Sequence, residues 1–341
     1  MKNLFLKAIF VIALLSGTVV YAQDVQLATL QQGENLQVFY GVDAFKNAAE
    51  NAEHGDLITL SAGTFNAGFN ITKAVTIQGA GYITDIENNK YPTIINNKFT
   101  VILPEDQHNF LMEGVMITDL FTFANKLTGA TLKKCKIYRV SLAYHNYQSV
   151  NCLIDQCRIW SFEPDHNSEN LHLRNSITYS IGNNSSTATF FVENCVIMNN
   201  VPHNITAYFK NNIMGGVNYH FSDSYSLSSN SIAYNNVFIR GSADDVVIKE
   251  NNKSVTSDEL FGKDIHSLEG YYGYEDNNEK YQLTENAKSV YLGVDKTQVG
   301  IYGGESPFTD IPTNPQIIEK RIDTKSTPDG KLNVNIKVEA Q

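Results

Sequence analysis

The sequence lacks the patterns that mark the common enzyme classes. It has a single Trp among 341 residues, and no phosphate-cradling glycine loop, Ser-His-Asp arrangement or zinc-ligand spacing can be recognised in it. No two histidines lie at a metal-ligand spacing on one expected element. We therefore expect no resident cofactor and no metal site, and we look for function in the surface that the fold presents.

Positive charge is also scarce. The chain has 26 Lys and Arg against 36 Asp and Glu, and its formal net charge is −10 at pH 7. Removing the first 22 residues takes away two lysines and no acid, which lowers the net charge by two. An acidic protein does not attract nucleic acid non-specifically, so we expect no nucleic-acid partner.

Long hydrophobic runs are missing beyond the N-terminus. Lys2 and Lys7 precede or flank the apolar run of residues 8–15, and Ala22 closes a small-residue cleavage site before Gln23. This pattern predicts a signal peptide over residues 1–22. The run is short for a bilayer, and no second span follows. We expect an exported protein, in the periplasm, at the cell surface or in the medium, without membrane insertion after cleavage.

What the sequence does contain is a short unit that recurs about every 20 residues from Asn109 to Gly241. A small residue flanked by apolar positions anchors each copy. The anchors are Gly114, Cys135, Cys157, Ser176, Cys195, Asn212 and Asn236. The positions three before each anchor are all apolar, and those two after are apolar apart from one Thr. We expect both columns to point inward.

Two polar columns accompany the apolar ones. The column two residues before the middle five anchors alternates in charge: Lys133, Asp155, Arg174, Glu193 and Lys210. A second column, directly before four anchors, is Asn. Stacked like charges repel, and stacked Asn side chains can hydrogen-bond along a turn. The pattern predicts an all-β, single-stranded parallel β-helix, in which each coil lies about 4.8 Å above the last.

The four cysteines allow two interpretations. In an exported protein they suggest disulfides, and the register places Cys135 and Cys157 on adjacent coils. Cys195 lies two coils from Cys157, beyond disulfide reach. We favour a row of small buried thiols.

The N-terminal part is expected to close one end of the solenoid. Residues 23–42 form a polar lead-in with one strand-like piece, Leu36 to Tyr40. A capping helix is predicted over residues 43–54, with Asp43 as N-cap and one apolar alanine-rich face. A helix of this kind suits a lid over the open end of a solenoid.

The segments after this helix carry a family resemblance. GDLITLSAGTF at residues 55–65, KAVTIQGAG at residues 73–81 and VGIYGG at residues 299–304 resemble coils of the pectin-lyase-like right-handed parallel β-helix superfamily, in its secreted bacterial members. The resemblance implies a β-helix over residues 43–304, whose closing coil contains residues 299–304. Residues 82–108 and 242–280 are expected to be loops that leave the coils.

Residues 305–341 are expected to form a C-terminal extension. Three prolines forbid regular pairing at its start. Residues 332–338 then alternate between apolar and polar positions. This tail is predicted to run along the solenoid or to dock as an edge strand.

One outward column suggests a binding site. Tyr138, Trp160 and Tyr179 each lie three residues past an anchor, so they should form an exposed strip on consecutive coils. Aromatic rings in a row suit the apolar faces of sugars. The alternative is that the insertion at residues 162–170 packs over the strip and makes it structural.

Arg139, Glu163, Asp165 and His166 gather near this strip and are the candidate catalytic residues. The alternative is a solvated loop tip. Calcium is expected only for a lyase, and the catalytic signatures of the family's lyases and hydrolases are absent. Our leading interpretation is binding or presentation of a polysaccharide or oligosaccharide without catalysis. The alternatives are a polysaccharide lyase or glycoside hydrolase acting on a uronate-containing glycan, and an adhesin or structural protein with a protein partner at the cell surface.

Overall fold

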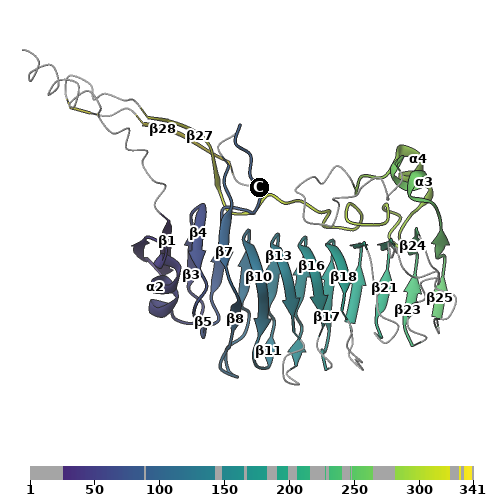
Figure 1. Cartoon of the computed structure of the whole chain (residues 1–341), viewed down its shortest axis with the longest axis horizontal. Helices are drawn as coiled ribbons and strands as arrows, with labels where there is room; N and C mark the ends of the chain where they lie inside the picture. Colours follow the sequence, from purple (N-terminus) through teal and green to yellow (C-terminus); the bar gives the residue numbers. More distant parts are fainter. Residues whose placement is uncertain are drawn as a thin grey trace, which may run out of the picture.

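The computed structural model is an all-β parallel solenoid (Figure 1). It describes residues 26–87, 90–142, 148–164, 167–182, 190–198, 206–215, 227, 230–239, 246, 248–263, 281–322, 330–331 and 334–339. The predicted signal peptide lies outside these residues. Within them, no helix has both the length and the apolar character needed to cross a lipid bilayer.

Two long sheets form the walls of the solenoid. The first sheet contains, in spatial order, β2 (Asn35–Tyr40), β1 (Leu27–Gln32), β3 (Leu57–Leu60), β6 (Thr76–Gln78), β9 (Leu111–Glu113), β12 (Thr131–Lys133), β15 (Leu153–Asp155), β17 (Leu171–Arg174), β19 (Phe190–Glu193), β21 (Tyr208–Lys210), β23 (Ile232–Tyr234) and β25 (Ile248–Glu250). All pairs from β3 to β25 are parallel.

The second sheet runs beside the first, one strand for each coil. Its strands are β26 (Lys253–Ser254), β24 (Val237–Phe238), β22 (Ile213–Met214), β20 (Val196–Ile197), β18 (Ile177–Ile181), β16 (Arg158–Glu163), β13 (Lys136–Ser141), β10 (Met116–Phe123), β7 (Thr93–Asn96) and β4 (Gly63–Asn66), joined by β8 (Phe99–Val101) and β5 (Asn70–Ile71). β11 (Leu127–Thr128) and β14 (Ser149–Val150), on successive coils, form a separate short parallel pair.

The strand register confirms six of the seven predicted anchors. Leu132 pairs with Ile154, which pairs with Leu173, and the same spacing continues along the later coils. The first anchor is wrong by one residue, because Leu132 pairs with Met112 rather than Leu111. The first anchor is therefore Val115.

Gly114 looked like an anchor because it is small, but glycine occupies this position because the backbone here is left-handed. It has φ +69 and heads a column of left-handed residues on successive coils, here called the turn ladder. Its members are Gly114, Lys134, Gln156, Asn175, Asn194, Asn211, Asn235 and Asn251. Asn and Gly tolerate this conformation best. The correction places Ile117 in the core and leaves Met116 half-buried, the reverse of what we expected.

We expected side-chain amides to stack in the Asn column directly before the anchors. The structure shows this stacking among the later anchors instead. Asn212 Nδ2 donates to Asn236 Oδ1 at 2.9 Å, and Asn236 Nδ2 donates to Asn252 Oδ1 at 3.0 Å. Each Oδ1 also accepts a backbone N–H from the preceding coil. These buried amides therefore lock the later coils to one another along the axis.

The core is a continuous apolar column. Aromatic rings stack along it, with centroids 5.9 Å apart between Phe45 and Phe99 and 5.6 Å apart between Phe99 and Phe121. The thiols of the later coils lie in the same core. All four cysteines are free and buried, as predicted: Cys135, Cys152, Cys157 and Cys195.

The N-terminal end is closed as expected by a helix, α2 (Ala44–Asn51), which buries Ala44, Phe45 and Ala48. Asp43 occupies the N-cap position, but its side chain makes no capping hydrogen bond. The lead-in is more ordered than predicted. In addition to the expected strand over Leu36–Tyr40, it contains β1, and the two form an antiparallel hairpin that adds to the first sheet.

Both predicted loop excursions prove to contain coil strands. Residues 82–108 include β7 and β8, and residues 242–280 include β25, β26 and the short helix α3 (Ser257–Phe261). Asn-rich composition suggested loops, because turn residues separate strands of only two to four residues in these coils.

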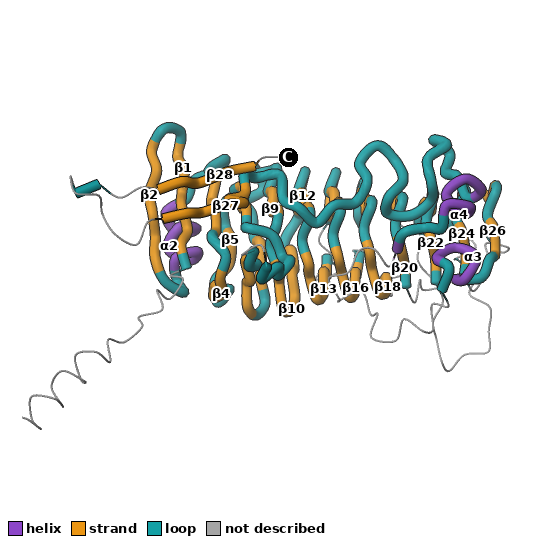
Figure 2. Tube along the Cα trace, turned by 90° about the horizontal axis from the view of Figure 1, so that it is seen from above, coloured by secondary structure: helices purple, strands orange, loops and turns teal. Residues whose placement is uncertain are grey.

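The C-terminal part does not close the solenoid in the expected way. After α4 (Glu285–Val290), residues 291–314, here called the strap, run lengthwise back along the solenoid toward its N-terminal end (Figures 1 and 2). Residues 299–304 thus belong to the strap and form no coil. The tail ends in an antiparallel hairpin of β27 (Gln316–Ile322) and β28 (Val334–Glu339), which pair with each other and not with an edge of the solenoid.

Candidate functional site

The predicted aromatic strip is present on the second sheet. Trp160 stacks on Tyr179 with ring centroids 4.3 Å apart and planes within 11°. Tyr138 stacks on the other side of Trp160 at 6.2 Å and 12°. The coils thus bring the three rings into one continuous stack along the solenoid axis.

Local strand geometry explains why the rings face outward. In β13, Ile137 and Val140 are fully buried, whereas Tyr138 and Arg139 between them are exposed. Two successive outward residues require an irregularity, and β10 shifts register against β13 at this level. The same bend recurs in β13, β16 and β18. It places a second outward column beside the rings, formed by Arg139, Ser161 and Ser180.

The stack changes how a ligand would meet the rings. We expected exposed faces, on which sugar rings could lie. Because the rings stack on one another, both faces of Trp160 meet a neighbouring ring. The side of the strip that points away from the solenoid therefore consists of ring edges.

The candidate catalytic residues are brought together only in part. Arg139 Nε lies 3.3 Å from Glu163 Oε1, and Arg139 remains about half exposed. Ser161 pairs with Arg139 on the next coil. Arg174 lies on the first sheet, where it bonds to Asp155. Asp165 and His166 lie outside the described residues.

The outer face of the first sheet carries the predicted charge alternation, here called the charge ladder. Its members, with one earlier acid added by the register, are Glu113, Lys133, Asp155, Arg174, Glu193 and Lys210. Lys210 Nζ lies 3.1 Å from Glu193 Oε1. The imidazole of His172, whose Nδ1 lies 3.8 Å from Glu193 Oε2, is the main cause that lowers the pKa of Glu193 to about 2.

Sequence reasoning missed a second aromatic stack beside the charge ladder. His172 stacks on Phe191 at 4.6 Å, and Phe191 stacks on Tyr208 at 4.9 Å. These residues lie four positions before the true anchors, in an outward column that also contains Leu153 and Ile232. The same column rule that found Tyr138 would have found them, had it been applied to the first sheet.

The strap, together with α3 and α4, covers a row of outward-facing apolar side chains on the second sheet. It buries Ile177, Val196, Ile213 and Val237, which point outward from successive strands. Phe308 lies over the guanidinium of Arg158, whose carbon is 5.8 Å from the ring centroid. The aromatic strip therefore borders a covered region rather than a bare sheet.

The turn ladder holds the strap through its side-chain amides. Asn175 Nδ2 donates to the carbonyl oxygens of Ile301 and Gly303, at 3.0 and 2.8 Å. Gln156 Nε2 donates to the carbonyl oxygens of Ser306 and Pro307 in the same way. The Asn column thus fixes the strap, and the stacking that we expected within this column is found among the anchors.

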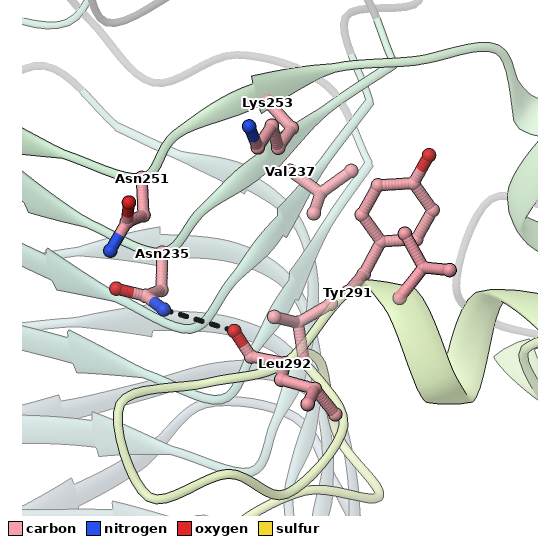
Figure 3. A pocket seen from close by; sticks show the side chains of 8 residues that line it. Asn235, Val237, Asn251, Lys253, Tyr291 and Leu292 are labelled. Carbon is pink, nitrogen blue, oxygen red and sulfur yellow. Dashed lines mark hydrogen bonds between the residues drawn. The ribbon is translucent and has the colours of Figure 1, made fainter.

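A small open pocket lies where the strap begins (Figure 3). Its volume is about 210 Å³. Its lining combines turn-ladder amides with apolar side chains: Asn235, Val237, Asn251, Lys253, Val290, Tyr291, Leu292 and Val299. Asn235 Nδ2 donates to the carbonyl oxygen of Leu292 and so closes one side. The hydroxyl of Tyr291 donates to Glu259, and burial is the main cause that raises its pKa to about 12.

Among the residues that the structure describes, no group of three His, Cys, Asp or Glu side chains could hold a metal ion. The calcium expected of a lyase therefore has no ligand set in this part of the chain. Comparison with known proteins adds no candidate, because no family model, curated protein or solved structure matches the chain.

Proposed function

We propose that this protein is exported and binds a carbohydrate along Tyr138, Trp160 and Tyr179, without cleaving it. The observation that carries the proposal is the three-ring stack, whose end member Tyr138 is 42% exposed. Stacking fixes the side chains before a ligand arrives, which lowers the conformational entropy lost on binding.

The groups around the strip suit a polyhydroxylated ligand. Ring edges offer C–H surface together with hydroxyl and N–H groups. The Arg139–Glu163 ion pair beside them supplies both donors and acceptors on the same coils. A chain of sugars that follows the solenoid axis would meet one aromatic ring on each of these three coils.

In this binding mode, ring edges and hydrogen bonds hold the ligand, and stacking of sugars on ring faces does not. A ligand held in this way should depend on Arg139 as well as on the rings. A ligand held by sugar–ring stacking alone would depend little on Arg139. The effect of an Arg139 substitution on affinity therefore distinguishes the two binding modes.

The test is a glycan array probed with the mature protein, with and without calcium. Tyr138→Ala and Arg139→Ala remove exposed side chains of the strip, and Tyr208→Ala is the matched control, since Tyr208 is 41% exposed at the end of the other aromatic stack. We expect affinity for the bound glycan to fall at least about tenfold in both strip variants and to persist in the control.

Two outcomes would contradict the proposal. One is the absence of binding to every glycan on the array. The other is binding that both strip variants retain. Release of an unsaturated or hydrolysed product from the bound glycan would retain the site and overturn the statement that the protein does not cleave its ligand.

A further inference from the structure

The first sheet ends at β2 with an open edge. β2 is the outermost strand at the N-terminal end (Figure 2), and within the described chain only β1 pairs with it. Its outer row is apolar and exposed: Leu36 is 63% exposed, Val38 41% and Tyr40 67%. An exposed apolar strand at a sheet edge is a template for pairing with another chain.

The backbone of the same three residues faces the open edge. Gly41 N donates to Gln26 O at 2.8 Å, which makes these two residues a hydrogen-bonded antiparallel pair. Such pairs alternate along an antiparallel ladder. The N–H and C=O groups of Leu36, Val38 and Tyr40 therefore point away from β1, toward solvent.

β2 also lacks the features that protect sheet edges. Its sequence, NLQVFY, has no charged residue and no proline. The opposite end of the sheet differs, because β25 exposes Lys249 and Glu250. Charged side chains on an edge strand discourage pairing. One end of the solenoid is thus open to pairing and the other is protected.

We propose that β2 pairs with β2 of a second copy of this chain, antiparallel, across a two-fold axis at Val38. In this register Leu36 lies opposite Tyr40 of the partner subunit, and Val38 lies opposite its own counterpart. Each of these is a hydrogen-bonded pair, so all the outward N–H and C=O groups of the three residues are used. The apolar rows of the two copies then join on one face.

Symmetry and charge both favour a second copy of this chain as the partner of β2. An uncharged strand can meet its own copy without repulsion, although the chain as a whole has a formal net charge of −10. A two-fold contact uses the same surface on both copies and closes after two. Because the other end of the sheet is protected by charge, the assembly stops at a dimer and does not continue as a fibre.

The test is sedimentation velocity of the mature full-length chain over a range of concentrations, with two lysine variants. Val38→Lys places two like charges face to face at the axis. Thr29→Lys is the matched control, since Thr29 lies opposite Val38 on the same face, one strand further in. We expect a reversible dimer whose dissociation constant rises at least about tenfold in Val38→Lys and little in Thr29→Lys.

A cross-linking experiment fixes the register independently. Hydrogen-bonded antiparallel pairs have Cα atoms about 5.5 Å apart, within disulfide reach. Val38→Cys should therefore form an intermolecular disulfide on mild oxidation. Val42→Cys, which is 48% exposed but far from the axis, should not. A wild-type chain that stays monomeric, a dimer unaffected by Val38→Lys, or cross-linking through residue 42 and not 38 would each overturn the proposal.

Discussion

Arg174 donates two hydrogen bonds of 3.1 Å, from Nε and Nη2, to the two carboxylate oxygens of Asp155 on the preceding coil. Asp155 is 2% exposed, so its carboxylate depends on this partner. Arg174→Met should lower the free energy of unfolding by about 2–3 kcal/mol in urea titrations. Lys46→Met, which breaks an exposed ion pair with Glu50, should cost less than about 1 kcal/mol. Equal losses would contradict the role given to the charge ladder.

The low pKa of Glu193 predicts how stability responds to acid. Its folded-state pKa, about 2, lies below the ordinary Glu value, mainly because of the neighbouring His172 imidazole, with a further contribution from Lys210. The stabilisation is therefore present above about pH 5 and is lost as the pH falls toward 2. Glu193→Gln should remove of the order of 2 kcal/mol of the pH dependence between pH 6 and pH 3. An unchanged pH profile in urea unfolding would contradict this assignment.

The strap should depend on the amides of the turn ladder. Asn175→Gly keeps the left-handed backbone position and removes two hydrogen bonds to the strap. We expect about 1–3 kcal/mol of destabilisation and faster amide hydrogen exchange in residues 291–314. Asn151→Gly is the control, because Asn151 is left-handed and exposed and its side chain accepts a hydrogen bond from Asn170 on the next coil. Exchange in the strap that does not change with Asn175→Gly would show that the amides do not hold it.

The cysteines should remain reduced and unreactive in the folded protein. All four are buried and free, and burial is the main cause that raises the pKa of Cys157. Thiol-specific reagents should therefore modify no cysteine under native conditions and all four after unfolding without reductant. Fewer than four reactive thiols in the unfolded chain would reveal a disulfide.

The repeated coils could be predicted because a parallel solenoid stacks equivalent residues. Residues one repeat apart, such as Asp155 and Arg174, lie directly above one another, so the spacing along the chain predicts which residues are neighbours in space. The aromatic strip followed from the same rule, since Tyr138, Trp160 and Tyr179 share one column. The stacking of the rings on one another follows from the coil spacing of about 4.8 Å, which is close to the separation of stacked rings.

One of the two expectations for the tail, a course along the solenoid, is met by residues 305–314, but the start of the strap at residues 291–304 and its contacts could not be predicted because these contacts join distant parts of the chain. Thr313 bonds to Glu113, and Asn314 Nδ2 donates to the carbonyl oxygen of Gly79, across some 200 residues. No local pattern contains such pairs. The misplaced anchor at Gly114 has a different cause: glycine satisfies both a small-residue position and a left-handed turn, and the sequence does not distinguish the two.

The carbohydrate proposal meets its most direct test in the fluorescence of Trp160, the one Trp in the chain. A glycan that binds along the strip contacts this indole or displaces water from around it. Titration of the mature protein with a glycan identified on the array should therefore change the emission of Trp160 saturably, with a midpoint equal to the dissociation constant from calorimetry. Calorimetric binding without any change in emission would place the glycan elsewhere on the solenoid and contradict the proposed site.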